Sequence, residues 1–258
     1  EPHLRRGTVI DALLLAGGGT AAAANKAFLD VAGRPLVWYV ARALAEAPSV
    51  GRIVAVGPAE DLRRACGPIL AAVVPATGSS VVENLLAALA ALPPAPRVLA
   101  AAADIPLLSA AVVEEFLSAC AKEEADFYYP IVPQTVVQDR YPGARKTFVR
   151  VLEGSFTGGS MFVFNPSVVP RVRELLDKMV RARKKPWIMA GIVGWSTVMK
   201  LASGRLAISE VEARLGEITG LVLRAVVLRR PELALDVDLE HPENLELIRR
   251  ALQDSPER

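Results

Sequence analysis

The chain has few of the side chains from which metal centres and disulfides are built. Its 258 residues include two cysteines, Cys66 and Cys120, and two histidines, His3 and His241. The cysteines form no Cys-x-x-Cys pair, and neither lies beside a histidine at metal-ligand spacing. A zinc site needs three or four ligands, so the sequence does not indicate one. We expect both cysteines to be buried, free thiols in a reducing compartment, and we therefore predict a cytoplasmic protein.

A strong charge of one sign is also missing. The 30 basic and 28 acidic residues leave a formal net charge of +2. A domain that binds nucleic acid needs a clustered basic face. The sequence therefore predicts no nucleic-acid partner.

Long apolar runs are absent as well. The longest, Trp187–Met199, is interrupted by glycine, serine and threonine and is shorter than the ~20 residues of a membrane span. Basic residues at 181–185 precede it, so the segment 181–200 is compatible with a helix at a membrane interface. A packed lid or a homodimer helix is the more common use of such a segment, and all three interpretations stay open.

What the chain does have is ample apolar material, 52% of its residues, in a regular order. Short apolar runs that predict strands alternate through the first half with patterns that predict helices. The predicted strands are 9–16, 52–56, 71–74 and 97–103, and the predicted helices are 35–47, 61–69, 81–92 and 109–122. This alternation is typical of a mostly parallel sheet covered on both faces, a three-layer α/β/α, Rossmann-like fold.

The second half of the chain is less regular. We expect strands at 126–132, 147–152, 160–164, 221–228 and 233–237, and helices at 167–183, 187–202, 209–215 and 242–252. A polar loop is predicted for 133–146. Since no linker or repeat separates the halves, we predict a single domain over residues 1–258.

The ends of the predicted parallel strands are where ligands bind in such a sheet. The first strand runs into Gly17-Gly18-Gly19, and Lys26 follows shortly after. Glycines let backbone N–H groups approach a polyphosphate closely, and a lysine supplies a compact positive charge. The spacing fits neither Gly-x-Gly-x-x-Gly, since Ala22 replaces the last glycine, nor the P-loop.

These residues resemble a known signature. Leu-Ala-Gly-Gly, a short loop, Lys26 and then Gly33-Arg-Pro-Leu36 are similar to the start of the MobA-like, sugar-nucleotidyltransferase-like NTP transferase superfamily. Three later segments follow in the expected order: Ala103-Asp-Ile-Pro106, Thr157-Gly-Gly-Ser160, and Asp236-Val-Asp238 with His241-Pro-Glu-Asn-Leu245. The resemblance covers nearly the whole chain and implies the GT-A-like nucleotidyltransferase fold. It implies a nucleotide-binding half at about 8–130 and an acceptor-side half at about 131–240.

The resemblance also implies residue roles. Asp104 and Asp236, or Asp238 in place of Asp236, would hold Mg²⁺, which prefers one or two carboxylates with phosphate oxygens and waters. Lys26 would be the catalytic residue and neutralise charge on the phosphates. The implied nucleotide-binding residues are Leu15, Ala16, Gly17, Gly18, Gly19, Lys26, Ser79, Ser80 and Asn84. The implied acceptor-binding residues are Gly158 and Gly159, and Lys146 and Arg150 are candidates for the acceptor phosphate from their place before this glycine turn.

The predicted function is transfer of a nucleoside monophosphate from an NTP to a small phosphorylated acceptor, with release of pyrophosphate. The chain departs from the family at two places: four alanines follow Thr20 where many members have an arginine, and His241 replaces a threonine after two extra residues. A catalytically silent nucleotide-binding regulator on the same fold therefore stays open. A nucleotide-sugar glycosyltransferase is a further alternative, although such enzymes usually place Asp-x-Asp where this chain has Asp104-Ile-Pro106.

Overall fold

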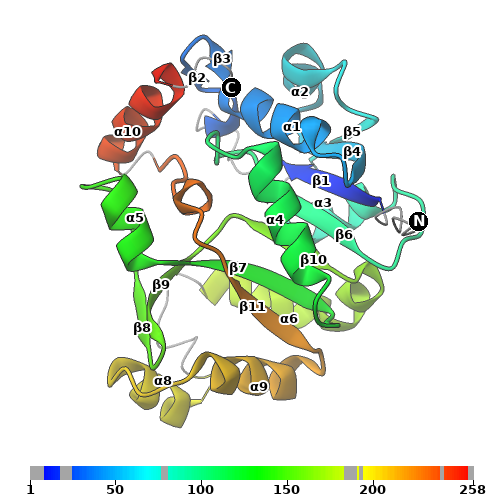
Figure 1. The fold of residues 1–258 in the computed structure, drawn as a ribbon. Helices are drawn as coiled ribbons and strands as arrows, with labels where there is room; N and C mark the ends of the chain where they lie inside the picture. The colour runs from blue at the N-terminus through cyan, green and yellow to red at the C-terminus, as the bar shows by residue number, and fades with distance from the viewer. Residues whose placement is uncertain are drawn as a thin grey trace, which may run out of the picture.

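The computed structural model describes residues 9–17, 25–76, 81–182, 191, 194–238 and 241–254. Its centre is a nine-stranded mixed sheet in the order β5-β4-β1-β6-β10-β7-β9-β8, with β11 paired to β7. Helices cover both faces of this sheet (Figure 1). The predicted α/β/α fold is therefore confirmed, and one sheet contains strands from both halves of the chain.

The first half forms the elements that the sequence predicts. Its four main strands pair in parallel: β1 (Ile10–Leu15), β4 (Val50–Gly57), β5 (Ala72–Pro75) and β6 (Val98–Ala102). The helices between and after them are α1 (Leu36–Glu46), α2 (Ala59–Cys66), α3 (Val81–Leu89) and α4 (Ala110–Cys120). A short helix, η1 (Lys26–Phe28), and a small hairpin, β2 (Asp30–Val31) with β3 (Arg34–Pro35), come between β1 and α1.

The strands of this half are apolar except near their starts, where β1 has Asp11 and β4 has Arg52, because both of their faces are buried farther along. Leu13 and Leu14 of β1 are both fully buried but belong to separate core clusters. Leu14 packs with residues of α1 and α4, and Leu13 packs with residues of α3. Adjacent strand residues point to opposite faces, so one strand serves both layers.

The second half adds strands of both directions. β7 (Phe127–Pro133) pairs antiparallel with β9 (Gly154–Gly158) and β10 (Met161–Phe164), and in parallel with β11 (Leu223–Val227). β8 (Val149–Val151) pairs with β9 at the sheet's end. The helical elements are α5 (Gln134–Arg140), η2 (Pro166–Val168), α6 (Val169–Ala182), α8 (Trp195–Ala202), α9 (Ile208–Thr219), η3 (Pro231–Leu233) and α10 (Pro242–Gln253).

Two predictions for this half are wrong, and one strand was not predicted. The segment 133–146, which we predicted to be a polar loop, contains α5. Val137 is the one buried residue of this helix, so the sequence shows no apolar period there. The strand predicted at 233–237 is the end of η3 followed by an extended segment outside the sheet. The structure also has a strand that the sequence did not predict, β9, because its glycines and polar residues hide the alternation of a strand.

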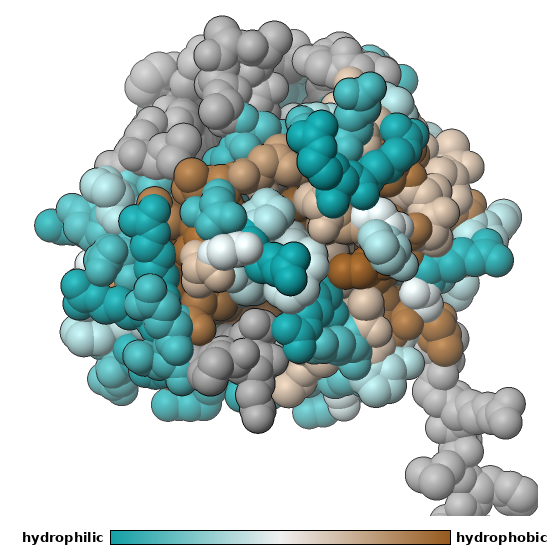
Figure 2. Space-filling view, turned by 90° about the horizontal axis from the view of Figure 1, so that it is seen from above, coloured by the Kyte–Doolittle hydropathy of each residue, from teal (hydrophilic) through white to brown (hydrophobic). Residues whose placement is uncertain are grey.

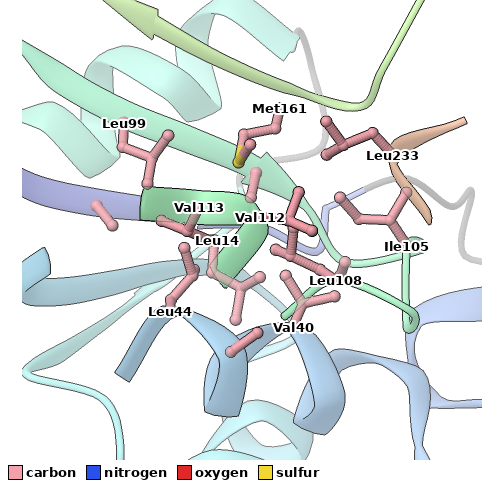
Figure 3. Packing of buried hydrophobic residues seen from close by; sticks show 14 of the residues in the cluster. Leu14, Val40, Leu44, Leu99, Ile105, Leu108, Val112, Val113, Met161 and Leu233 are labelled. Atoms are coloured by element: carbon pink, nitrogen blue, oxygen red, sulfur yellow. The ribbon is translucent and has the colours of Figure 1, made fainter. Parts of the chain in front are cut away.

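The main core cluster joins distant parts of the chain on the α1/α4 face of the sheet. Figure 3 shows Leu14, Val40, Leu44 and Met161 in this cluster, with Ile105 entering from the loop after β6 and Leu233 from η3. Both Ile105 and Leu233 are fully buried. The core thus anchors the two segments that carry Asp104 and Asp236.

Within the described residues, no helix is long and apolar enough to cross a membrane. The described part of the segment 181–200 contains α8, on which Trp195 and Met199 are exposed. Its membrane and homodimer interpretations stay predictions.

Candidate functional site

Three segments that lie far apart in the sequence meet at the Lys26 ammonium group. Lys26 Nζ lies 2.5 Å from Asp104 Oδ2 and donates a hydrogen bond of 2.9 Å to the Val237 carbonyl oxygen. The Val237 N–H in turn donates to the Asp104 carbonyl oxygen at 2.9 Å. The structure therefore brings together the predicted catalytic lysine, the acid after β6 and the C-terminal acidic segment.

Asn25 fixes Lys26 beside the end of β1. Its side-chain amide donates to the Ala16 carbonyl oxygen at 2.6 Å and accepts from the Ala27 N–H at 3.0 Å. The second bond caps η1, which begins at Lys26. Asn25 was not predicted, although an asparagine directly before the lysine is a recognisable capping signal.

Gly17 lies beside another predicted nucleotide-binding residue, Asn84. A Cβ added to Gly17 would lie 3.4 Å from Asn84 Nδ2, so the end of β1 and the start of α3 are adjacent. Leu15 and Ala16 lead into this point. Gly18, Gly19, Ser79 and Ser80 lie outside the described residues, and their roles stay predictions.

Asp104 is held by buried neighbours on either side. Ala103 and Ile105 are at most 3% exposed, so the acid cannot move far from the end of β6. Asp104 Oδ2 binds Lys26, whereas Asp104 Oδ1 is buried and has no hydrogen-bond partner among the described residues. A buried carboxylate oxygen that lacks a hydrogen-bond donor destabilises the folded protein, so such atoms are rare.

The C-terminal acidic segment is extended although it belongs to no strand. Leu235 and Val237 are fully buried, and Asp236 and Asp238 between and after them are partly exposed. The alternation places both acids on one side, as the sequence predicted, even though the predicted strand is wrong. Both line the same pocket.

That pocket has a volume of about 340 Å³ and lies between the acidic segment, the loop before β8 and the start of α10. Lys146 forms an ion pair with Asp236 inside it. The residues that line the pocket are all polar or charged: Arg145, Lys146, Thr147, Thr157, Asp236, Asp238, His241 and Asn244. The predicted acceptor-side residue Lys146 thus lies next to a predicted metal ligand.

Asn244 holds the loop that carries Lys146. Its side chain is 1% exposed, accepts from the Arg145 N–H at 2.8 Å and donates to the Arg145 carbonyl oxygen at 3.0 Å. A side-chain amide can make both bonds because it carries an acceptor and a donor. Sequence reasoning gave Asn244 no role, although it stands in the terminal segment that carries the resemblance.

The other predicted acceptor-binding residues divide. Arg150 is not among the residues that line the pocket, and its side chain packs against Gly204 in the turn after α8. Gly158 lies under Tyr129, whose hydroxyl a Cβ at Gly158 would overlap, and Gly159 packs against Pro130 and Leu233. Close packing by itself therefore accounts for a glycine at each of these two positions.

Tyr129 was missed by sequence reasoning and lies near Asp236. Burial first, and the charge of Asp236 second, raise the pKa of Tyr129 above its usual value of 10.0. The hydroxyl therefore stays a neutral donor at physiological pH. The signal was strand alternation: Tyr128 is buried in the main core, so its neighbour Tyr129 faces the other side of β7.

The acids fit a magnesium ion better than zinc. The described residues contain no cluster of three or more histidine, cysteine or acidic side chains that could hold a metal ion. Magnesium needs only one or two carboxylates when substrate phosphates complete its shell. Asp104 Oδ1, for which the described part of the chain provides no donor, and the acids of the pocket match that requirement.

The face that carries α10 is of mixed polarity. Figure 2 looks down on the top of Figure 1, where α10 and the β2–β3 hairpin lie, and shows hydrophilic side chains beside hydrophobic ones. The exposed Trp195 and Met199 belong to α8, which lies at the opposite end in Figure 1.

Comparison with known families agrees with the geometry. The family model of the MobA-like NTP transferase domain matches residues 12–189, more than half of the chain. The chain belongs to this family. Nucleotidyl transfer is accordingly the general activity that the family gives to this chain. No curated protein sequence matches the chain.

Solved structures resemble the chain over nearly its whole length. A hypothetical transferase from Thermus thermophilus is 37% identical, with a TM-score of 0.81, and the match covers 92% of this chain and all of that one. Two distant structures, each 12% identical, share the fold. A CMP:2-keto-3-deoxy-manno-octonic acid synthetase complexed with CTP has a TM-score of 0.64 and covers 96% and 99% of the two chains. The 4-diphosphocytidyl-2C-methyl-D-erythritol synthase of Anaerococcus prevotii has a TM-score of 0.59 and covers 96% and 97%.

Proposed function

We propose that this protein is a Mg²⁺-dependent nucleotidyltransferase that joins a nucleoside monophosphate to a small anionic acceptor and releases pyrophosphate. The observation that carries the proposal is the meeting of Lys26, Asp104 and the segment 235–238 at one point. A lysine beside two acidic segments, at the end of a strand that runs into glycines, is suited to holding a triphosphate and its cation.

Each residue has a role in the proposal. Asp104 and Asp236, or Asp238 in place of Asp236, would hold Mg²⁺, which when bound offsets the negative charge of the triphosphate. Lys26 neutralises charge on the phosphates, and Gly17 lets the backbone approach them. An acceptor phosphate oxygen forms a bond to the α-phosphorus as the bond from that phosphorus to the bridging oxygen of pyrophosphate breaks.

No general base is required in this reaction. A phosphate oxygen is already anionic at neutral pH, so the nucleophile carries no proton that must be removed. Of the chain's two histidines, His241 is the N-cap residue of α10 and lines the pocket, and the proposed reaction does not need it as a base.

The pocket supports a small, polar acceptor. Its 340 Å³ suit a compound of a few carbons with one phosphate, and its lining contains cations and hydroxyl groups but no apolar side chain. A large, flat cofactor would need apolar or aromatic surface. Two distant structural neighbours are named for cytidylyl compounds, so CTP is the first nucleotide to test.

Pyrophosphate release tests the proposal. The protein is incubated with Mg²⁺, each of the five common NTPs and a panel of small phosphorylated sugars, polyols and acids. We expect release with one NTP and one acceptor class, and a loss of about 10²–10³-fold in Lys26→Ala and Asp104→Ala. Lys178→Ala, an exposed lysine on α6, is the matched control and should keep full activity.

The same experiment separates the silent regulator from the enzyme. The alanines that follow Thr20 favour this second function, because they remove a phosphate-binding guanidinium found in related sequences. A silent regulator would show nucleotide-dependent thermal stabilisation without pyrophosphate release for any acceptor. Release that disappears in Lys26→Ala would rule it out.

A further inference from the structure

Both proposed metal-binding segments are already neutralised by lysines. Lys26 pairs with Asp104, and Lys146 pairs with Asp236. In each of these pairs both side chains are a third exposed or less, whereas the surface pair Lys200–Glu210 is 56% and 42% exposed. Reduced exposure weakens screening by solvent, so these two pairs interact more strongly than the surface pair.

Side-chain hydrogen bonds fix the backbone beside Lys146. Asn244 fixes the Arg145 backbone on both its N–H and its carbonyl oxygen. Because Lys146 is the next residue, its ammonium group is delivered to Asp236 from a clamped backbone. The backbone of the loop is therefore fixed at Arg145, and Lys146 can leave the acid only by a rotation of its own flexible side chain.

A positive charge held at Asp236 opposes a divalent cation at the same carboxylate. The ammonium group satisfies one oxygen of Asp236 and repels a second cation that approaches the pair. An anion in the pocket changes this balance, because Lys146 also lines the pocket and can turn toward the anion. Arg145 lines the same pocket and adds to the attraction for an anion.

We infer that Lys146 couples the two ligands of the site: it keeps the cation affinity of the protein low until the anionic group of an acceptor draws the lysine away from Asp236. The inference rests on the proposed function, in which Asp236 or Asp238 holds the cation. It assigns Lys146 a positioning role between acceptor and metal, and it makes acceptor and cation binding mutually reinforcing.

Cation binding in the absence of nucleotide tests the inference. Mn²⁺ serves as the probe and its binding to the full chain is measured by electron paramagnetic resonance, with and without sulfate as the anion. We expect Lys146→Met to bind Mn²⁺ more tightly than the wild type by a factor of roughly five to ten, as expected for removing a nearby unit charge at a partly exposed site. Sulfate should tighten Mn²⁺ binding in the wild type but not in Lys146→Met.

Two variants serve as controls. Lys146→Arg keeps the charge and should bind Mn²⁺ as weakly as the wild type. Lys200→Met removes a lysine from the exposed pair with Glu210 and should leave Mn²⁺ binding unchanged. Circular dichroism of each variant establishes that it is folded before binding is measured.

The outcomes are distinct. Equal Mn²⁺ affinity of Lys146→Met and the wild type, or a sulfate effect that is the same or absent in both, would overturn the inference. Pyrophosphate release by the wild type is measured in parallel. Its absence with every acceptor would overturn the proposed function, whereas release combined with unchanged Mn²⁺ affinity in Lys146→Met would overturn the coupling alone.

Discussion

The two halves of this protein position their polar groups in different ways. In the first half, a parallel sheet buried on both faces places Gly17 and Asp104 at the ends of neighbouring strands, β1 and β6. In the second half, loops and an extended segment outside the sheet carry Lys146 and Asp236. Their positions depend on individual contacts, such as the Asn244 clamp, rather than on the repeat of the fold.

This difference shows two ways of placing polar groups. In the first half the ends of parallel strands place them, whereas in the second half side-chain contacts such as those of Asn244 place them. Function resides in sites carried by a fold rather than in the fold itself. The structural neighbours at 12% identity accordingly share the fold with the chain and say nothing about its acceptor.

Matched core truncations in the two halves should give the largest effects. Leu13→Ala and Leu235→Ala each remove a fully buried side chain, and each should lower the free energy of unfolding by about 2–5 kcal/mol. Urea unfolding measures this loss. Only Leu235→Ala should also raise the KM for the acceptor, since Leu235 directly precedes Asp236. An equal rise in both variants would show that the halves are not separable in this way.

Gly→Ala replacements at Gly57 and Gly158 test one close contact in each half of the chain. A Cβ at Gly57 would lie 2.9 Å from the Ala16 carbonyl oxygen, a backbone atom that cannot move aside, whereas at Gly158 it would overlap the Tyr129 side chain. Each Gly→Ala change should cost about 1–3 kcal/mol in urea unfolding. Tyr129→Ala should relieve the cost of Gly158→Ala in the double variant. If the two costs simply add, Tyr129 is not the obstacle.

Two asparagines offer a third, smaller test. Asn25 in the first half and Asn244 in the second each use both ends of the amide to bind backbone groups. Replacement by aspartate removes the donor and should cost about 1–3 kcal/mol of unfolding free energy. Steady-state kinetics should show a higher KM for the nucleotide in Asn25→Asp and for the acceptor in Asn244→Asp. The reverse pattern would contradict the division of the site between the halves.

The two thiols give the smallest effect and report on the first half alone. Burial raises the pKa of Cys66 to about 11 and that of Cys120 to about 12. The folded protein therefore keeps both protons when the unfolded chain loses them, so stability should fall as the pH rises above the ordinary thiol pKa of 9.0. At pH 8 a thiol reagent should modify both residues slowly in the native protein and fast in denaturant. Fast labelling of the native protein would show that this half opens readily.

The fold class and the family could both be predicted from the sequence. Continuous apolar runs such as those of β1 and β6 mark strands buried on both faces, because polar residues are too costly there. The same pattern predicted that the glycines after β1, Lys26 and Asp104 lie at a ligand site, since ligands bind where parallel strands end. The resemblance carried by these residues was confirmed by the family match over 12–189.

The contacts around Lys146 and Asp236 could not be predicted from the sequence. Lys146 pairs with Asp236, and Asn244 holds Arg145, although the partners are about 90 or more positions apart in the sequence. Tyr129 lies near Asp236 because it faces the opposite side of β7 from its neighbour Tyr128. No local period records such contacts, because each depends on how separate loops dock onto a shared core. The extended segment 235–238 shows the same limit: its alternation placed both acids on one side, but its Val237 N–H bonds to the Asp104 carbonyl oxygen in a loop rather than to a strand of the sheet.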